Sequence, residues 1–156
     1  MFVAMLENPS FNSYSFDSLR TGIMAGAPCP IEVMKKVQSN MHVREITIAY
    51  GMTETSPVSF QSATDDPLER RVSTVGKVQP HIQVKIIDEN GNDLPWNGID
   101  VGNLLVRGPW VCRSYYEEDV GVSFDNGWFD TGDIASVDTN GSVSYTHLTL
   151  PTKRTV

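Results

Sequence analysis

The stretch from residue 21 to residue 60 constrains the fold of this chain more than any other. Two apolar runs, "TGIMA" and "REITIAY", read as short strands. Between them Pro30 suits the first turn of a helix, and apolar residues then recur every three or four positions, at Ile31, Met34, Val37 and Met41. A strand, a loop, a helix and a second strand in this order predict a parallel sheet of the α/β class.

The second half of the chain has a different residue pattern, which predicts a small antiparallel β unit. Short alternating runs are separated by turn signals, as in "IQVKIID", "GNLLVRG", "GWFDTGDIASVD" and "TNGSVSY", and "ENGND" reads as a tight turn. The polar segment "QSATDDPLERR" separates the two patterns. We therefore expect an α/β part over residues 1–66 and a β-barrel-like part over residues 67–145.

Charge and cysteine content exclude several classes of partner. The 156 residues include 19 acidic and 12 basic side chains, a net charge of −7, without a run of like charges that would attract nucleic acid. Cys29 and Cys112 lie far apart and outside any zinc-ligand spacing, which favours a reducing cytoplasm. No stretch approaches the roughly 18 apolar residues of a membrane helix. A peripheral membrane association of a longer parent protein stays open.

Two loops after the expected strands are candidate binding segments. In "AGAPCP", Gly26 lets the backbone approach a flat ligand, while Ala27 and Pro28 shape the loop; an ordinary turn is the alternative. In "YGMTETSP", Tyr50 offers an aromatic face, Gly51 to Thr53 an approachable backbone and a hydroxyl, and Glu54 a hard oxygen ligand for Mg²⁺. These groups suit a nucleotide-phosphate site, and a turn that satisfies its own backbone is the alternative.

A third candidate is the motif "GWFDTGD", which ends at Asp133. A carboxylate at such a turn can accept hydrogen bonds from two vicinal hydroxyls, such as those of a ribose. The alternative is an aspartate that caps local amides. No G-x-S-x-G elbow and no G-x-x-x-x-G-K-[ST] loop occur, so the sequence favours neither a serine hydrolase nor a P-loop enzyme.

Taken in order, "AGAPCP", "YGMTETSP", "STVGKVQPHIQVKIID", "GNLLVRGPWV" and "GWFDTGD" resemble the adenylate-forming (AMP-binding) superfamily, and within it the fatty-acid CoA ligases. The resemblance covers residues 1–143. In that family an acid and ATP form an acyl-adenylate, and the acyl group passes to coenzyme A. The implied fold is the end of the large α/β domain followed by its small β-barrel subdomain.

The resemblance also implies roles for single residues. It places Gly26, Ala27 and Pro28 along the adenine and acyl pocket, and Tyr50, Gly51 and Met52 beside the adenine. It assigns the α-phosphate to Thr53, Mg²⁺ to Glu54 and the ribose hydroxyls to Asp133, so Thr53 and Glu54 are the expected catalytic residues. Fixed donors and a metal ion at the α-phosphate would stabilise the charge that develops there as pyrophosphate leaves.

Several family features are missing from the chain. The opening "MFVAMLENPS" reads as the end of an amphipathic helix, and the family's phosphate loop and C-terminal lysine do not occur. Residues 146–156 match no family motif, and we expect them to be a foreign end. We therefore expect a fragment that forms no acyl-adenylate alone and exposes apolar sheet edges that favour aggregation.

Three alternatives stay open. The parent could be an aryl or amino-acid adenylating enzyme of the same superfamily. The chain could instead be a nucleotide-binding module without catalysis. The first part, "AYGMTETSPVSFQ" included, resembles medium-chain synthetases, whereas "DLPWNGIDVGNLLVRGPWVCRSYY" resembles another branch of fatty-acid CoA ligases, so one gene and a joined sequence are both open.

Overall fold

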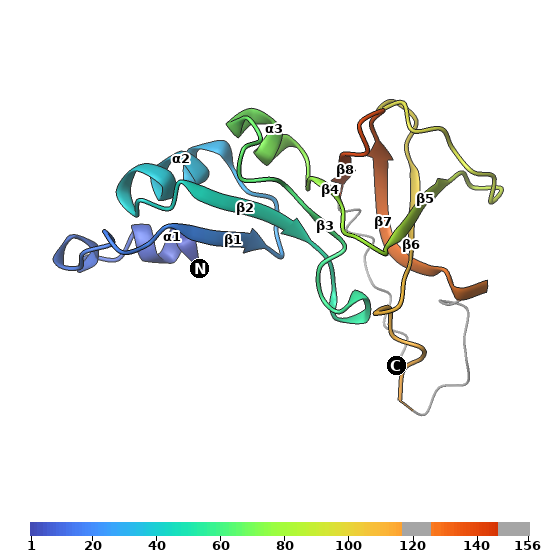
Figure 1. The fold of residues 1–156 in the computed structure, drawn as a ribbon, viewed down its shortest axis with the longest axis horizontal. Helices are drawn as coiled ribbons and strands as arrows, with labels where there is room; N and C mark the ends of the chain where they lie inside the picture. Colours follow the sequence, from blue (N-terminus) through green and yellow to red (C-terminus); the bar gives the residue numbers. More distant parts are fainter. Residues whose placement is uncertain (117–125, 147–156) are drawn as a thin grey trace, which may run out of the picture.

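The chain folds into two neighbouring four-stranded sheets (Figure 1). The computed structural model describes residues 1–116 and 126–146. The strand order is β1-β2-β3-β4 in the first sheet and β5-β6-β7-β8 in the second. Each sheet is built from consecutive strands, so most of the pairing is local in sequence.

The first sheet begins with the predicted strand, helix and strand. β1 (Thr21–Ala25) and β2 (Glu45–Tyr50) pair in parallel along their length, and α2 (Ile31–Asn40) connects them. The short helix α1 (Phe2–Leu6), predicted from the opening residues, and the 3₁₀ turn η1 (Phe11–Ser13) precede them. The parallel α/β prediction is therefore confirmed.

α2 covers the sheet with the predicted apolar stripe. Met34 and Val37 are fully buried, and Met41, just beyond the helix, is 1 % exposed. Pro30 lies immediately before the helix rather than in its first turn, and its carbonyl accepts hydrogen bonds from the amides of Val33 and Met34. Proline still suits this position, because its fixed φ of −62° here leads the chain into the helix without requiring an N–H donor.

The first sheet continues beyond the part that was expected to be α/β. η2 (Thr53–Thr55), β3 (Phe60–Gln61), α3 (Leu68–Ser73) and β4 (Lys77–Val78) follow, and β3 and β4 extend the sheet in antiparallel order. The sequence did not indicate α3. Because β4 pairs with β3, the chain changes sheets between Val78 and Gln83, after the predicted boundary at residue 67.

The second sheet is the predicted antiparallel unit. It contains β5 (Gln83–Ile87), β6 (Gly102–Arg107), β7 (Phe129–Val137) and β8 (Val143–Thr146), each antiparallel to its neighbour. Its buried face carries Ile86, Leu104, Val106, Ala135, Val137 and Val143. The predicted turn in "ENGND" forms, with the Gly91 amide donating to the Asp88 carbonyl over 3.1 Å.

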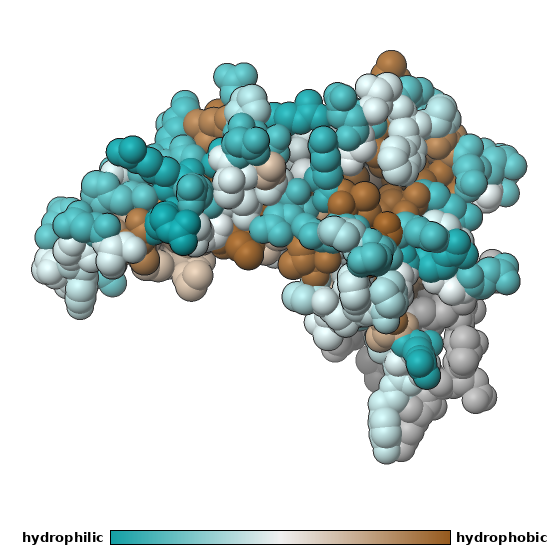
Figure 2. Space-filling model, in the orientation of Figure 1, coloured by the Kyte–Doolittle hydropathy of each residue, from teal (hydrophilic) through white to brown (hydrophobic). Residues whose placement is uncertain are grey.

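Apolar surface remains at the edge of the first sheet. β1 is the end strand of this sheet among the described residues, and Ile23 is 52 % exposed. The first sheet and its helices α1, α2 and α3 together form the first unit. Figure 2 shows apolar surface along the same lower edge of this unit, where α1 and β1 lie. No helix in the described ranges has the length and apolar content to cross a membrane. Of the expected foreign end, residues 147–156 lie outside the described residues.

Candidate nucleotide half-site

Two of the predicted site residues meet where β2 ends. The Tyr50 hydroxyl donates a hydrogen bond of 2.5 Å to the Asp133 carboxylate, although the residues are 83 positions apart. Tyr50 is only 6 % exposed, because its ring packs against Phe60 and Tyr145 at centroid distances of 5.5 and 4.9 Å. The structure thus joins the last residue of β2 to a carboxylate of β7.

Burial and the neighbouring carboxylate determine the charge state of this group. Burial raises the pKa of Tyr50 far above its ordinary value, and the hydrogen bond to Asp133 raises it further. Burial also raises the pKa of the Tyr145 hydroxyl, with a further contribution from the charge of Asp133. Both phenols therefore stay protonated at neutral pH. Tyr50 acts as a donor that orients Asp133, and a carboxylate can accept several further hydrogen bonds.

The predicted proline-containing loop faces the same region. Ala27 and Pro28 line a small cavity of about 80 Å³ together with Tyr145, the residue that packs on Tyr50. Gly26 adopts a φ of +82°, a conformation that favours glycine, and an added Cβ would meet no atom within 4 Å. Conformation rather than a close approach explains this glycine. Three separate segments of the sequence therefore converge around Tyr50, Asp133 and Tyr145.

The turn after β2 depends on a close backbone approach. A Cβ on Gly51 would lie 1.6 Å from the carbonyl oxygen of Pro57, so only glycine fits this position. The Thr55 hydroxyl closes the turn by accepting from the Met52 amide and donating to the Met52 carbonyl, both over 3.2 Å. Thr55 thus forms the alternative arrangement, in which a side chain of the turn satisfies the backbone of that turn. The side chain of Thr53 is exposed.

Glu54 is oriented by a segment that the sequence did not single out. Its carboxylate accepts a hydrogen bond of 2.9 Å from the Tyr115 hydroxyl, and its backbone carbonyl accepts one of 2.8 Å from the Cys112 amide. No pattern around "RSYY" predicted this contact. Among the described residues, no group of three or more His, Cys, Asp or Glu side chains could hold a metal ion.

Comparison with known proteins identifies the family. A family model described as AMP-binding enzyme matches residues 1–116. The chain belongs to this family. The chain is 44 % identical over 145 residues to YngI of Bacillus subtilis (strain 168), a protein named as an acyl-CoA synthetase. It is 36 % identical over 144 residues to the mitochondrial medium-chain acyl-CoA ligase ACSF2 of Mus musculus.

Solved structures agree with the fold class expected for an AMP-binding enzyme. The anthranilate CoA ligase AuaEII, solved with anthranoyl-AMP, superposes with a TM-score of 0.79 at 25 % identity over 92 % of this chain. The alignments cover 90 % of this chain in both curated relatives but only 26 % of YngI, 23 % of ACSF2 and 27 % of AuaEII. The chain thus spans about a quarter of each of these proteins.

Proposed function

We propose that this chain carries the adenosine-binding half of an ATP-dependent acyl-CoA synthetase. The complete enzyme would convert a medium- or long-chain fatty acid into an acyl-adenylate and pass the acyl group to coenzyme A. The observation that supports this most is the hydrogen bond between Tyr50 and Asp133. It brings two motifs of the family resemblance into one group at the carboxyl end of β2, where α/β sheets bind ligands.

Each residue of the half-site has a proposed role. Asp133 accepts hydrogen bonds from the ribose hydroxyls, and Tyr50 orients its carboxylate. The loop Gly26 to Pro28 and the backbone of Gly51 and Met52 border the adenine, since Ala27 and Pro28 line the cavity beside Tyr145. Because Tyr50 is almost fully buried, it supports the adenine pocket through its edge and through Tyr145 rather than by an open ring face.

The exposed turn after β2 has a separate proposed role. Thr53 donates its hydroxyl to the α-phosphate, and Glu54 ligates Mg²⁺. A single carboxylate suits Mg²⁺, which keeps several water ligands and is otherwise bound by substrate phosphates. When bound, the ion would neutralise phosphate charge. The hydrogen bond from Tyr115 would hold the Glu54 carboxylate in place for this role.

Titration with AMP and with 2′-deoxy-AMP tests the half-site directly. We expect the chain to bind AMP at least tenfold more tightly than 2′-deoxy-AMP, because a hydrogen bond to a charged acceptor contributes about 1.5–3 kcal/mol. Asp133→Asn should weaken AMP binding about tenfold and remove most of that preference. Tyr50→Phe should weaken AMP binding less, because Asp133 remains but is no longer oriented.

Asp93→Asn is the matched control. Asp93 belongs to the same sheet region, and its side chain is 71 % exposed beside Lys85. This substitution should leave both affinities unchanged. Equal binding of the two nucleotides by the unaltered chain, or equal losses in Asp133→Asn and Asp93→Asn, would contradict the ribose assignment.

Stable acyl-adenylate analogues separate a fatty-acid from an aryl substrate. We expect a decanoyl-adenylate analogue to bind more tightly than a benzoyl one, since ACSF2 of Mus musculus is named as a medium-chain ligase. The alternative of an aryl-activating parent is favoured by AuaEII, which is named as an anthranilate CoA ligase. Tighter binding of the benzoyl analogue would support that alternative.

Activity of the chain alone is a separate expectation. With ATP, Mg²⁺ and C6 to C12 acids, we expect no release of pyrophosphate above background, because charge stabilisation from the missing phosphate loop and lysine is required. We also propose a cytoplasmic location, in keeping with the free thiols of Cys29 and Cys112. The mouse relative is named as mitochondrial, so the compartment of the parent needs direct imaging.

A further inference from the structure

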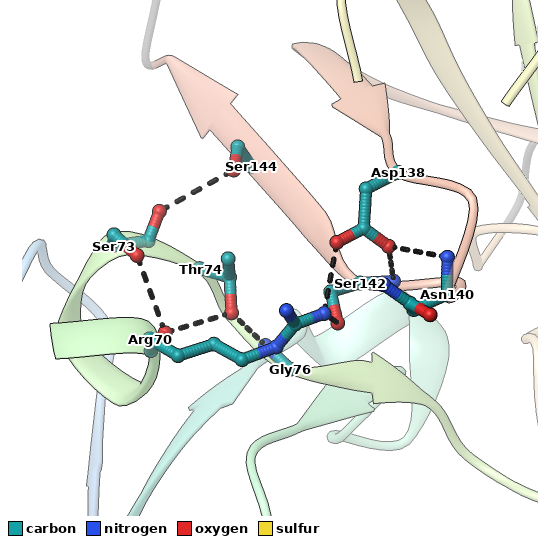
Figure 3. A network of polar contacts seen from close by, with 8 residues as sticks. All are labelled: Arg70, Ser73, Thr74, Gly76, Asp138, Asn140, Ser142 and Ser144. Atoms are coloured by element: carbon teal, nitrogen blue, oxygen red, sulfur yellow. Dashed lines mark hydrogen bonds and ion pairs between the residues drawn. The ribbon is translucent and has the colours of Figure 1, made fainter. Parts of the chain in front are cut away.

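The β7–β8 hairpin contacts the first unit near the turn that joins β7 to β8, away from Tyr50. Arg70 of α3 donates from one guanidinium nitrogen to the Asp138 carboxylate and to the Ser142 hydroxyl, both over 2.8 Å (Figure 3). The two charged side chains are 35 % and 31 % exposed, so the pair is partly shielded from water. This contact joins a helix of the first unit to the turn of the second sheet.

Asp138 is held in place from its other side as well. Its second carboxylate oxygen accepts hydrogen bonds from the amides of Asn140 and Ser142, both over 2.8 Å (Figure 3). Burial by itself would raise the pKa of this carboxyl, but these amides and Arg70 together hold the pKa below its ordinary value. The carboxylate therefore stays charged and orders both the turn and the link to α3.

Backbone hydrogen bonds continue the attachment next to this ion pair. The Val75 amide donates to the Val143 carbonyl over 2.9 Å, and the Val143 amide donates to the Gly76 carbonyl over 3.0 Å. The Ser144 hydroxyl donates to the Ser73 carbonyl over 3.3 Å. β8 thus runs along the segment between α3 and β4 before it reaches Tyr145.

The other end of the same hairpin carries the proposed ribose ligand. Asp133 lies within β7 and Asp138 directly follows it, so roughly 16 Å of extended backbone separates them. Ala135 pairs with Tyr145 between these ends. The hairpin therefore contacts the first unit in two regions. Near the turn it does so through Arg70 and the backbone hydrogen bonds of Val143, and near Asp133 it does so through Tyr50. A hairpin held at both regions has a fixed orientation, whereas weakening the attachment near the turn lets it shift relative to Tyr50.

We propose that Arg70 and Asp138 are positioning residues, which fix the β7–β8 hairpin so that Asp133 stays in reach of the ribose. The inference rests on the proposed function, because it concerns the same nucleotide half-site. Neither side chain touches Tyr50 or Asp133 in the contacts described. Their effect on the nucleotide passes through the hairpin.

Affinity for AMP and for 2′-deoxy-AMP tests this role in the full chain. Arg70→Gln and Asp138→Asn should each weaken AMP binding about five- to tenfold and 2′-deoxy-AMP binding less, since that nucleotide has only one of the two hydroxyls that Asp133 would contact. The double variant should bind AMP no more weakly than the more affected single variant, because both substitutions remove the same link. Arg70→Lys keeps the charge and one donor, and should recover part of the preference for AMP.

Amide hydrogen exchange in the absence of ligand provides an independent measurement. In Arg70→Gln, exchange at Val75 and Val143 should accelerate about tenfold, while Ile48 in β2 stays unchanged. Arg20→Gln is the matched control, because Arg20 forms an exposed ion pair with Glu45 at the start of β2, the end opposite Tyr50. It should change neither the exchange rates nor the nucleotide preference.

Each outcome decides the matter. Unchanged exchange at Val75 and Val143 in Arg70→Gln, or equal weakening of both nucleotides, would overturn the positioning role. If the unaltered chain binds no AMP, the proposed function fails. The position of the Asp133 amide resonance then decides: a displacement in Arg70→Gln but not in Arg20→Gln supports the inference, and no displacement overturns it.

Discussion

The two sheets bury their strands in different ways. β2 is buried at five consecutive residues from Ile46 to Tyr50, whereas β6 alternates between fully and partly buried residues. A strand that pairs in parallel and is covered by helices has apolar neighbours on both faces, while an antiparallel sheet can leave one face to water. The proposed half-site lies where these two kinds of sheet meet, with Tyr50 from a strand buried on both faces and Asp133 from a half-exposed one.

The sheets also differ in how they accommodate arginine. Arg71 of α3 is 6 % exposed and donates to four carbonyl oxygens of the first unit, at distances of 2.7 to 3.4 Å. Its Nε is buried without a partner in the described part of the chain. Arg107 of the second sheet instead lies exposed over the Trp128 ring, 4.6 Å from its centroid. A buried cation that joins α3, β2 and the loop before α3 contributes far more to the stability of the fold than an exposed one.

Arg71→Met should therefore give the largest effect on stability. Removing the guanidinium leaves carbonyls of Ile46, Thr64 and Asp66 without their donor, so the free energy of unfolding should fall by about 3 kcal/mol. Urea denaturation followed by circular dichroism measures the change. Arg107→Met is the control in the other sheet and should cost less than about 1 kcal/mol. Similar losses in both variants would show that the two sheets do not differ in this way.

Acid should loosen the second sheet's attachment before it affects the first sheet. The pKa of Asp138 lies below its ordinary value of 3.8 in the folded state, so its stabilising contribution is present above that value and is lost as the pH falls through the folded pKa. We expect Asp138→Asn to lower the free energy of unfolding by about 1 kcal/mol at pH 7.

Measuring the free energy of unfolding of the unaltered chain and of Asp138→Asn at lower pH tests the direction of the pKa shift. The difference between the unaltered chain and Asp138→Asn should shrink steadily below about pH 4, because protonation then makes the Asp138 side chain neutral, as the Asn amide is. Arg71→Met should keep its full deficit over the same range. A difference for Asp138→Asn that grows on acidification would contradict the lowered pKa.

Ile23→Lys should have the smallest effect on unfolding but a clear effect on association. β1 has no charged residue, is the end strand of the described first sheet, and exposes Ile23. Such an edge can pair with another copy, and a lysine on it opposes this pairing. Sedimentation should show less self-association, with the free energy of unfolding changed by no more than about 0.5 kcal/mol. Ile99→Lys, at an exposed residue before β6, should leave the association unchanged.

Local sequence patterns were sufficient for most of the elements. Ile31, Met34 and Val37 predicted the buried stripe of α2, and the β-branched run before Gly51 predicted β2. α3 was missed because the polar segment around Asp65 and Asp66 reads as a linker. Arg71 looks like a surface charge in the sequence, and only the surrounding carbonyls of other elements make it a buried anchor.

The candidate site divides in the same way. The spacing and order of the motifs determined which residue types are available: a glycine after β2, a hydroxyl-rich turn, and a carboxylate at Asp133. Three contacts depended on the tertiary structure, namely Tyr50 with Asp133, Tyr115 with Glu54, and Arg70 with Asp138. Each joins residues more than 60 positions apart. The sequence by itself determined the local elements, because helix and strand periodicity are properties of neighbouring residues. Only the packing of segments that are distant in the sequence decided these pairs.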